Sequence, residues 1–178
     1  MWQLPHTIFT DALIAAVSVF LLRCFVGHLS RVEGNSMQSS LHNKDWVLVW
    51  RLPYLFHAPR RHEVVICHYP GRRMKHCKWL HQHFIKRVVG LPGDWLEIAN
   101  GTVLVDGQPL AEPYLDPEKC RYPRSRPLRR LDRQDFYVMG DNRDLSNDSR
   151  SIGPIRRKAI RGRAVCIIWP PKRWQKIH

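Results

Sequence analysis

Acidic residues are scarce in this sequence. Its 178 residues include 15 Asp and Glu against 29 Lys and Arg, which gives a formal net charge of +14. Such a basic protein is attracted to polyanions, either nucleic acid or anionic lipid, and the charge alone does not choose between them. The sequence also lacks any internal repeat, which excludes collagen-like, coiled-coil and solenoid architectures. A composition of 44% hydrophobic and 25% charged residues indicates one globular domain with room for an appendage.

Cysteines are few, odd in number and without a C-x-x-C pair. The five are Cys24, Cys67, Cys77, Cys120 and Cys166. This pattern argues against a full disulfide framework and against a zinc ribbon, although one bridge stays open. The histidines between positions 68 and 83 fit no common metal-site spacing. We therefore predict neither a metal nor a cofactor.

One long apolar segment, Ile8 to Val26, lies near the N-terminus. As a helix it would extend about 28 Å, close to the roughly 30 Å hydrocarbon core of a bilayer. We expect residues 1–28 to form a membrane anchor. The alternatives are a cleaved secretion signal, which would lack its basic n-region and its A-x-A-like site, and a buried core helix. No Lys or Arg precedes the segment, so the positive-inside rule would keep the following domain in the cytoplasm.

The rest of the chain, residues 29–178, reads as mostly β. Short apolar and β-branched runs have the length of strands and are separated by turn signals such as Leu91–Asp94 and Asn100-Gly101. The predicted strands are Trp46–Trp50, Val64–Tyr69, Phe84–Val89, Trp95–Ile98, Val103–Val105, Phe136–Met139 and Ala164–Trp169.

Two basic stretches, Arg72–His83 and about 118–133, are expected to be surface loops. They are either merely solvated or dock on anionic membrane lipid, at about 1 kcal/mol per basic group near the surface. Aromatic residues do not alternate with these charges in a stacking pattern, so nucleic acid is not an expected partner.

The position of Lys86 in the sequence suggests a catalytic role for its amine. In a strand over Phe84–Val89 it would share one face with Phe84 and Val88. An apolar setting disfavours the ammonium, and bringing its pKa from about 10.4 to about 8 takes roughly 3 kcal/mol of desolvation. A neutral lysine can act as general base and activate a nearby serine, as in known Ser-Lys dyads.

Three blocks in this order follow the hydrophobic segment: Glu33–Met37, Lys86–Asp94 and Gly140–Gly153. Together they closely resemble type I signal peptidases, the membrane-bound serine proteases that remove secretion signals, including bacterial leader peptidase and the mitochondrial inner-membrane peptidases. The resemblance covers most of the chain, and the Gly-Asp-Asn-Arg-Asp-x-Ser-x-Asp-Ser-Arg string in the third block is its most specific part. It implies a signal-peptidase-type β core with an N-terminal transmembrane helix.

The resemblance also implies roles for individual residues. Ser36 matches the nucleophile, with its backbone N–H as oxyanion donor, and Lys86 matches the general base. Supporting positions are Met37 beside the nucleophile, Ser146 as the serine that orients the lysine amine, and Asp148 with Arg150 as an ion pair beneath the site. The residues at 141–144 match structural positions of that loop. Where some relatives have an additional hydroxyl donor, this chain has Gly34.

One departure concerns the turn after the nucleophile. The family usually continues Met-x-Pro-Thr, whereas this chain has Met37-Gln38-Ser39-Ser40, so Ser39 replaces the proline. This removes some rigidity but no catalytic atom.

The resemblance implies that preprotein signal peptides are cut after a small residue at the membrane surface. It also implies a single-pass protein of the cell membrane with its catalytic domain on the extracytoplasmic face, against the weak charge argument. Two alternatives are a non-enzymatic basic membrane-surface binding module and a self-cleaving repressor of the damage-response type. The repressor should carry a helix-turn-helix domain where this chain has its apolar segment.

Overall fold

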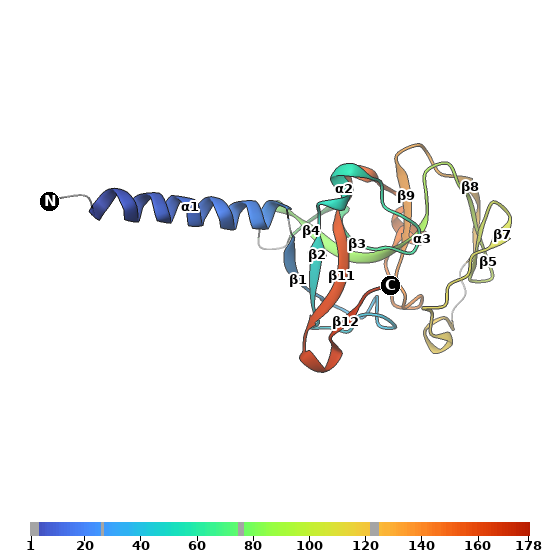
Figure 1. Ribbon diagram of the computed structural model, residues 1–178. Coiled ribbons are helices and arrows are strands. Elements are labelled where there is room, and N and C mark those ends of the chain that lie inside the picture. The colour runs from blue at the N-terminus through green and yellow to red at the C-terminus, as the bar shows by residue number, and fades with distance from the viewer. Residues whose placement is uncertain (1–3, 26, 75–76, 122–124) are drawn as a thin grey trace.

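The computed structural model describes residues 4–25, 27–74, 77–121 and 125–178. A single long helix, α1 (Leu4–Phe25), stands apart from a β-rich body that holds all the other elements (Figure 1). This arrangement agrees with the predicted mostly β fold. In the described part of the chain, no helix combines the length and apolar character needed to cross a membrane.

Eight strands form the larger sheet. Their order is β1-β2-β11-β3-β4-β9-β10, with β12 paired to β11, and every pairing in it is antiparallel. The strands are β1 (His28–Arg31), β2 (Trp46–Trp50), β3 (Val64–Met74), β4 (Cys77–Gly90), β9 (Asp135–Met139), β10 (Ile155–Arg156), β11 (Ile160–Trp169) and β12 (Gln175–Lys176).

A second sheet has four strands in the order β7-β6-β5-β8. They are β5 (Trp95–Ala99), β6 (Thr102–Val105), β7 (Gln108–Pro109) and β8 (Arg126–Arg130). The predicted Asn100-Gly101 hairpin joins β5 to β6, and both turn residues have positive φ, 47° and 84°. Asn and Gly tolerate that conformation, which is why this dipeptide predicts the turn correctly.

Helical segments in the body are short. They are α2 (Pro53–Phe56), α3 (Ser149–Ile152) and three 3₁₀ turns at η1 (Pro117–Lys119), η2 (Arg157–Ala159) and η3 (Pro171–Arg173). The hydrophobic core instead comes from strand alternation. In β2, Val47 and Val49 are buried while Trp46 and Trp50 face outward, as the period of two along a strand requires.

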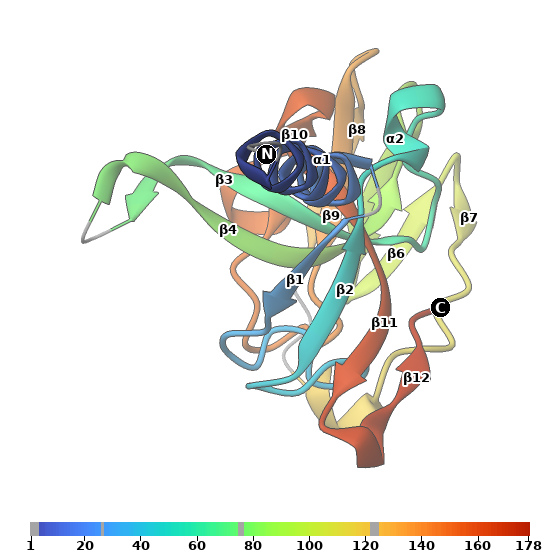
Figure 2. The same ribbon diagram turned by 60° about the vertical axis from the view of Figure 1, so that its left-hand side comes forward.

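Both predicted loops contain regular structure, so this part of the sequence interpretation is wrong. The Arg72–His83 stretch belongs to the ends of β3 and β4, whose pairing runs out to Met74 and Cys77 as a hairpin arm (Figure 2). Antiparallel pairing satisfies the backbone amides whatever the side chains are. The many basic residues of this stretch made it look like a loop, although its backbone pairs as a strand. In the 118–133 stretch, β8 pairs with β5. Residues 75–76 and 122–124 lie outside the described residues.

Candidate active site

Ser36 lies in the compact turn between β1 and β2. Two successive backbone hydrogen bonds close this turn, from Gln38 N to Asn35 O (3.2 Å) and from Ser40 N to Met37 O (2.9 Å). Met37, exposed by only 2%, packs in a core cluster with Val32 and Leu41 and thereby fixes the turn to the sheet. Met37, predicted to support the site, thus anchors Ser36 through its apolar side chain.

Lys86 reaches Ser36 from β4. Its Nζ lies 2.7 Å from Ser36 Oγ, although the two residues are 50 positions apart in the chain. The same amine donates to the Ile85 carbonyl oxygen at 2.9 Å, which fixes its direction. Only 3% of Lys86 is exposed, so the pair sits at the edge of the protein interior with the serine on the more open side.

The surroundings of Lys86 disfavour its charged form. Its Nζ lies 5.4 Å from the centre of the Phe84 ring, on the strand face that alternation predicts. Burial lowers the pKa of Lys86 to about 8, and the negative charges of Asp148 and Asp141 only partly oppose this effect. Cys67 is itself completely buried, and burial raises the pKa of its thiol, so it stays neutral beside the amine. With this pKa about a tenth of the amine is unprotonated at pH 7 and about half at pH 8.

The loop after β9 touches the backbone of the serine directly. Asn142 N donates to Ser36 O at 3.1 Å. Gly140 lies so close that an added Cβ would fall 2.4 Å from Ser36 O and 2.3 Å from Ser146 Oγ. Position 140 therefore has no room for a side chain. Glycine at this position allows the Gly140–Gly153 block to contact the Glu33–Met37 block.

Asp148 and Arg150 form the ion pair that the resemblance implies. Arg150 donates from Nε to Asp148 Oδ1 and from Nη2 to Oδ2, both at 2.9 Å, and both side chains are buried. Asp148 Oδ2 also accepts from Gly140 N at 2.9 Å, which ties the pair to the serine turn. Burial alone would raise the pKa of Asp148, but the hydrogen bonds and charge of Arg150 outweigh it, so the pKa lies below its usual value.

Ser146 does not bond to Lys86. Its hydroxyl is buried beside Gly140, and the described residues show no hydrogen bond between it and the lysine amine. The role of Ser146 in orienting the lysine amine therefore stays a prediction. It requires the Ser146 hydroxyl to shift when substrate binds.

A second buried ion pair, which the sequence analysis missed, supports the site from the other face of β4. Arg87 and Asp141 are each only 1% exposed in their side chains and join through two hydrogen bonds, of 2.9 and 2.8 Å. Ser40 completes the group, because its Oγ donates to Asp141 Oδ2 at 2.5 Å and accepts from Arg87 Nη2 at 2.9 Å. Strand alternation could have indicated this pair. Arg87 follows Lys86 in β4, so its side chain points to the opposite face of the strand, which is also buried.

Comparisons with known proteins point to one family. A family model described as signal peptidase, peptidase S26, matches residues 6–169. A probable signal peptidase I-1 from Synechocystis sp. is 37% identical over 177 residues, covering 99% of this chain and 88% of that protein. A signal peptidase I from Leptolyngbya laminosa is 35% identical over 162 residues, covering 90% of this chain and 77% of that protein.

Among solved structures, a signal peptidase I from Enterococcus faecalis V583 covers 60% of this chain and 97% of its own, with a TM-score of 0.47 and 24% identity. The family match and the two relatives confirm the resemblance drawn from the three sequence blocks. The chain belongs to the signal peptidase family, peptidase S26.

Proposed function

We propose that this protein is a membrane-bound serine endopeptidase that cleaves N-terminal signal peptides from secreted preproteins after small residues, with Ser36 as nucleophile and Lys86 as general base. The 2.7 Å approach of a buried, partly neutral amine to a serine hydroxyl is the observation that carries the proposal. Membership of the signal peptidase family speaks against the non-enzymatic basic module.

The reaction follows from the properties of the pair. Ser36 Oγ attacks the scissile carbonyl while Lys86 Nζ takes its proton, and the backbone N–H of Ser36 donates to the developing oxyanion. Lys86 then gives a proton to the leaving amine, which leaves an ester between the signal peptide and Ser36. The same amine next activates the water that hydrolyses this ester. The chemistry uses neither a metal nor a cofactor.

The other matched residues hold this pair in place. Asp148 with Arg150 supports the loop around Gly140, which in turn bonds the carbonyl of Ser36 through Asn142 N. Met37 anchors the turn in the core. A hydroxyl donor at position 34 is absent because that residue is glycine, so the oxyanion depends on the backbone donor.

The proposal is tested by incubating the protein with a preprotein in detergent and measuring product masses. The expected product is a mature chain that begins directly after a small residue. Ser36→Ala should yield the uncut preprotein. Cleavage at unrelated sites, or the same cleavage by Ser36→Ala, would contradict the proposal.

The dependence of kcat/KM on pH should follow the ionisation of the Lys86 amine. Because only neutral Lys86 accepts the serine proton, kcat/KM should rise about tenfold per pH unit below a midpoint near 8. We expect activity about 50-fold lower at pH 6 than at pH 8 under this single ionisation. A midpoint near 6.5 would instead identify a histidine as the base.

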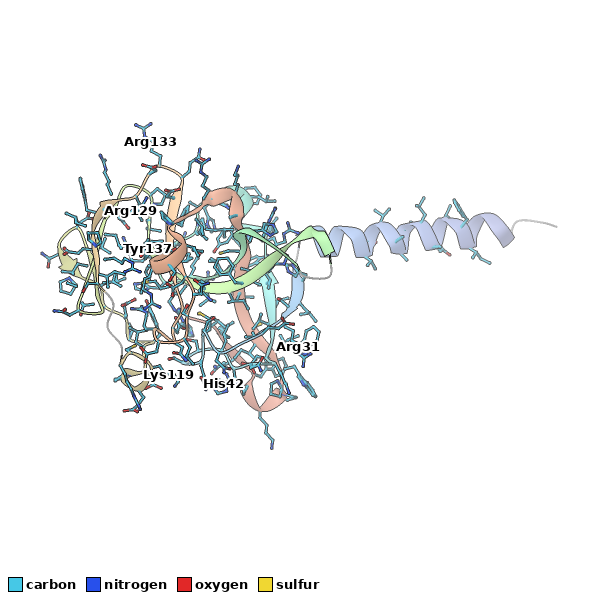
Figure 3. The ribbon with its side chains drawn as sticks, turned by 180° about the vertical axis from the view of Figure 1, so that it is seen from behind. Arg31, His42, Lys119, Arg129, Arg133 and Tyr137 are labelled. Carbon is cyan, nitrogen blue, oxygen red and sulfur yellow. The ribbon has the colours of Figure 1, made fainter. Side chains whose placement is uncertain are left out.

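We further propose that residues 1–28 anchor the enzyme in the cell membrane, with residues 29–178 as the catalytic domain on the extracytoplasmic face. The helix α1 stands clear of the body, and its described side chains have no neighbouring element (Figure 3). Six large apolar side chains on it are 46–72% exposed: Ile8, Phe9, Leu13, Ile14, Val17 and Val19. Such a surface requires an apolar partner, which a bilayer supplies. The orientation follows the family resemblance.

The anchor proposal predicts that the full chain stays with the membrane pellet after an alkaline carbonate wash. A chain that begins at His28 should appear in the supernatant. Release of the full chain would contradict the anchor and would leave the peptidase chemistry intact.

A further inference from the structure

A bulge in β8 turns two arginines toward the same side of the second sheet. β8 lies at the edge of this sheet and pairs with β5, where Leu96 is opposite Arg129 and Ile98 is opposite Arg126, with a register shift between the two pairs. One extra residue of β8 is thus accommodated, which defines a bulge. In a regular strand, positions 126 and 129 would point to opposite faces, because side chains alternate. With the bulge, both side chains reach one cavity.

This cavity has a volume of about 270 Å³ and is lined by residues of β5, β8, β9 and the segment around α3. Three of its lining residues are arginines: Arg126, Arg129 and Arg150. Tyr137 and Leu96 also line it. In the part of the chain that the structure describes, no Asp or Glu belongs to the lining. The cavity is therefore strongly positive.

Two of the three arginines lack a counter-charge. Arg150 is paired with Asp148, whereas neither Arg126 nor Arg129 forms an ion pair with a carboxylate in the described ranges of the chain. Arg126 is nonetheless held in place, because its Nε donates to Arg150 O at 2.7 Å and its Nη1 to Ser125 O at 3.0 Å. Two positive charges that share a cavity repel each other, and a bound anion would remove that cost.

Tyr137 adds a neutral donor to the same place. Burial and the charge of Asp148 raise the pKa of Tyr137 to about 12, although Arg126, Arg150 and Arg129 act in the opposite direction. All three guanidinium groups therefore lie near the phenol, as the cavity lining also indicates. The phenol stays protonated at neutral pH, so its O–H can donate a hydrogen bond to an anion.

The charge of the donors indicates a phosphate. Arg126 and Arg129 contribute two uncompensated positive charges to the cavity. A phosphate monoester carries close to two negative charges at neutral pH and balances both, whereas a carboxylate balances only one. Planar guanidinium groups also donate paired, charge-assisted hydrogen bonds to phosphate oxygens.

The position of the cavity favours a soluble phosphate over a lipid headgroup. Figure 3 shows Arg129 and Tyr137 on the part of the body remote from α1. If α1 is embedded in a bilayer, the cavity lies farther from the headgroups than the end of α1 does. Electrostatic attraction to a membrane falls off within a Debye length of about 10 Å.

We infer that this cavity binds the phosphate dianion of a soluble ligand, either inorganic phosphate or a small phosphate monoester. Arg126 and Arg129 are its charged donors, and Tyr137 is its neutral donor. The site is separate from Ser36 and Lys86, so the inference does not depend on the proposed function.

The test titrates the full chain in detergent at pH 8 with inorganic phosphate, glycerol 3-phosphate or acetate, at constant ionic strength, by isothermal titration calorimetry. We expect one saturable site for phosphate and binding of acetate that is about tenfold weaker or less. Binding of only one of the two phosphates supports the site and identifies the source of its ligand. If the chain binds neither phosphate, or binds acetate as tightly, the inference is overturned.

Two neighbouring arginines provide the variant and its matched control. Arg129→Gln should weaken phosphate binding about tenfold or more, and because this side chain is exposed the fold should persist. Arg130→Gln removes the same charge from the next position, where the guanidinium lies 5.9 Å from the centre of the Trp95 ring and does not line the cavity. It should bind phosphate like the parent. Parent-like binding by Arg129→Gln, or an equal loss in Arg130→Gln, would overturn the inference.

Failure of this inference and failure of the proposed function are distinguishable. Ser36→Ala should bind phosphate like the parent while it loses preprotein cleavage. A parent chain that binds phosphate without cleaving a preprotein would contradict the peptidase proposal alone. A parent chain that cleaves a preprotein without binding either phosphate would overturn the inference alone.

Discussion

Replacing Lys86 with methionine should lower kcat/KM for preprotein cleavage by about 10⁴-fold or more, since removing one member of a nucleophile–base pair disables the pair as a unit. Methionine retains most of the apolar stem within the core and removes only the amine that lies 2.7 Å from Ser36 Oγ. The fold should persist, because the buried ammonium is costly to hold and its loss relieves desolvation. Initial cleavage rates of the parent and the variant, measured on one preprotein, provide the comparison.

Two variants make this result specific. Ser36→Ala should lose as much activity as Lys86→Met, and combining both should cost little more than either alone. Lys158→Met removes an exposed lysine outside the site and should leave the rate within about twofold of the parent. Substantial cleavage by Lys86→Met in a folded protein would mean that another group activates the serine.

The largest effect on stability is expected at Asp141. Asp141→Ala would leave Arg87 buried without its counter-charge, and breaking such a pair costs about 3–5 kcal/mol. This is a large part of the roughly 5–15 kcal/mol by which domains are stable. Activity of the remaining folded protein should also fall, because Asn142 N, the next donor along, bonds Ser36 O. Urea unfolding followed by tryptophan fluorescence measures the loss.

The control and the paired variant separate charge from packing. Asp132→Ala removes an exposed carboxylate and should change the free energy of unfolding by no more than about 0.5 kcal/mol. Arg87→Met/Asp141→Leu removes both charges and should recover much of the stability lost in the single variant. If the double variant is no more stable than Asp141→Ala, hydrogen bonds of Arg87 to other groups, such as the His62 carbonyl, dominate instead.

Strand positions were predictable because alternation and turn residues act locally. The seven predicted strands all fall within observed strands, and Asn100-Gly101 forms its hairpin because both residues accept positive φ. The arm of β3 and β4 was missed for a physical reason. Its pairing depends on backbone hydrogen bonds that continue from the apolar base of the hairpin, whereas the sequence shows only basic side chains there.

The site was predictable in part. The alternation of β4 placed Lys86 on the face of Phe84, and the family resemblance paired it with Ser36, to which it is adjacent in space. Contacts across the fold were not predictable in the same way. The strand pattern predicts only that Arg87 points away from Lys86. Its contacts with Asp141 and Ser40 depend on how distant segments pack together in the folded protein.

The central claim is that the pKa of Lys86 is low enough to leave part of its amine neutral near physiological pH, and nitrogen-15 NMR of the lysine Nζ groups tests it most directly. In protein labelled with ¹⁵N-lysine, we predict one resonance that titrates with a pKa of about 8 and that disappears in Lys86→Met. If every lysine, including Lys86, stays protonated up to about pH 10, the amine cannot serve as the base and the account is contradicted.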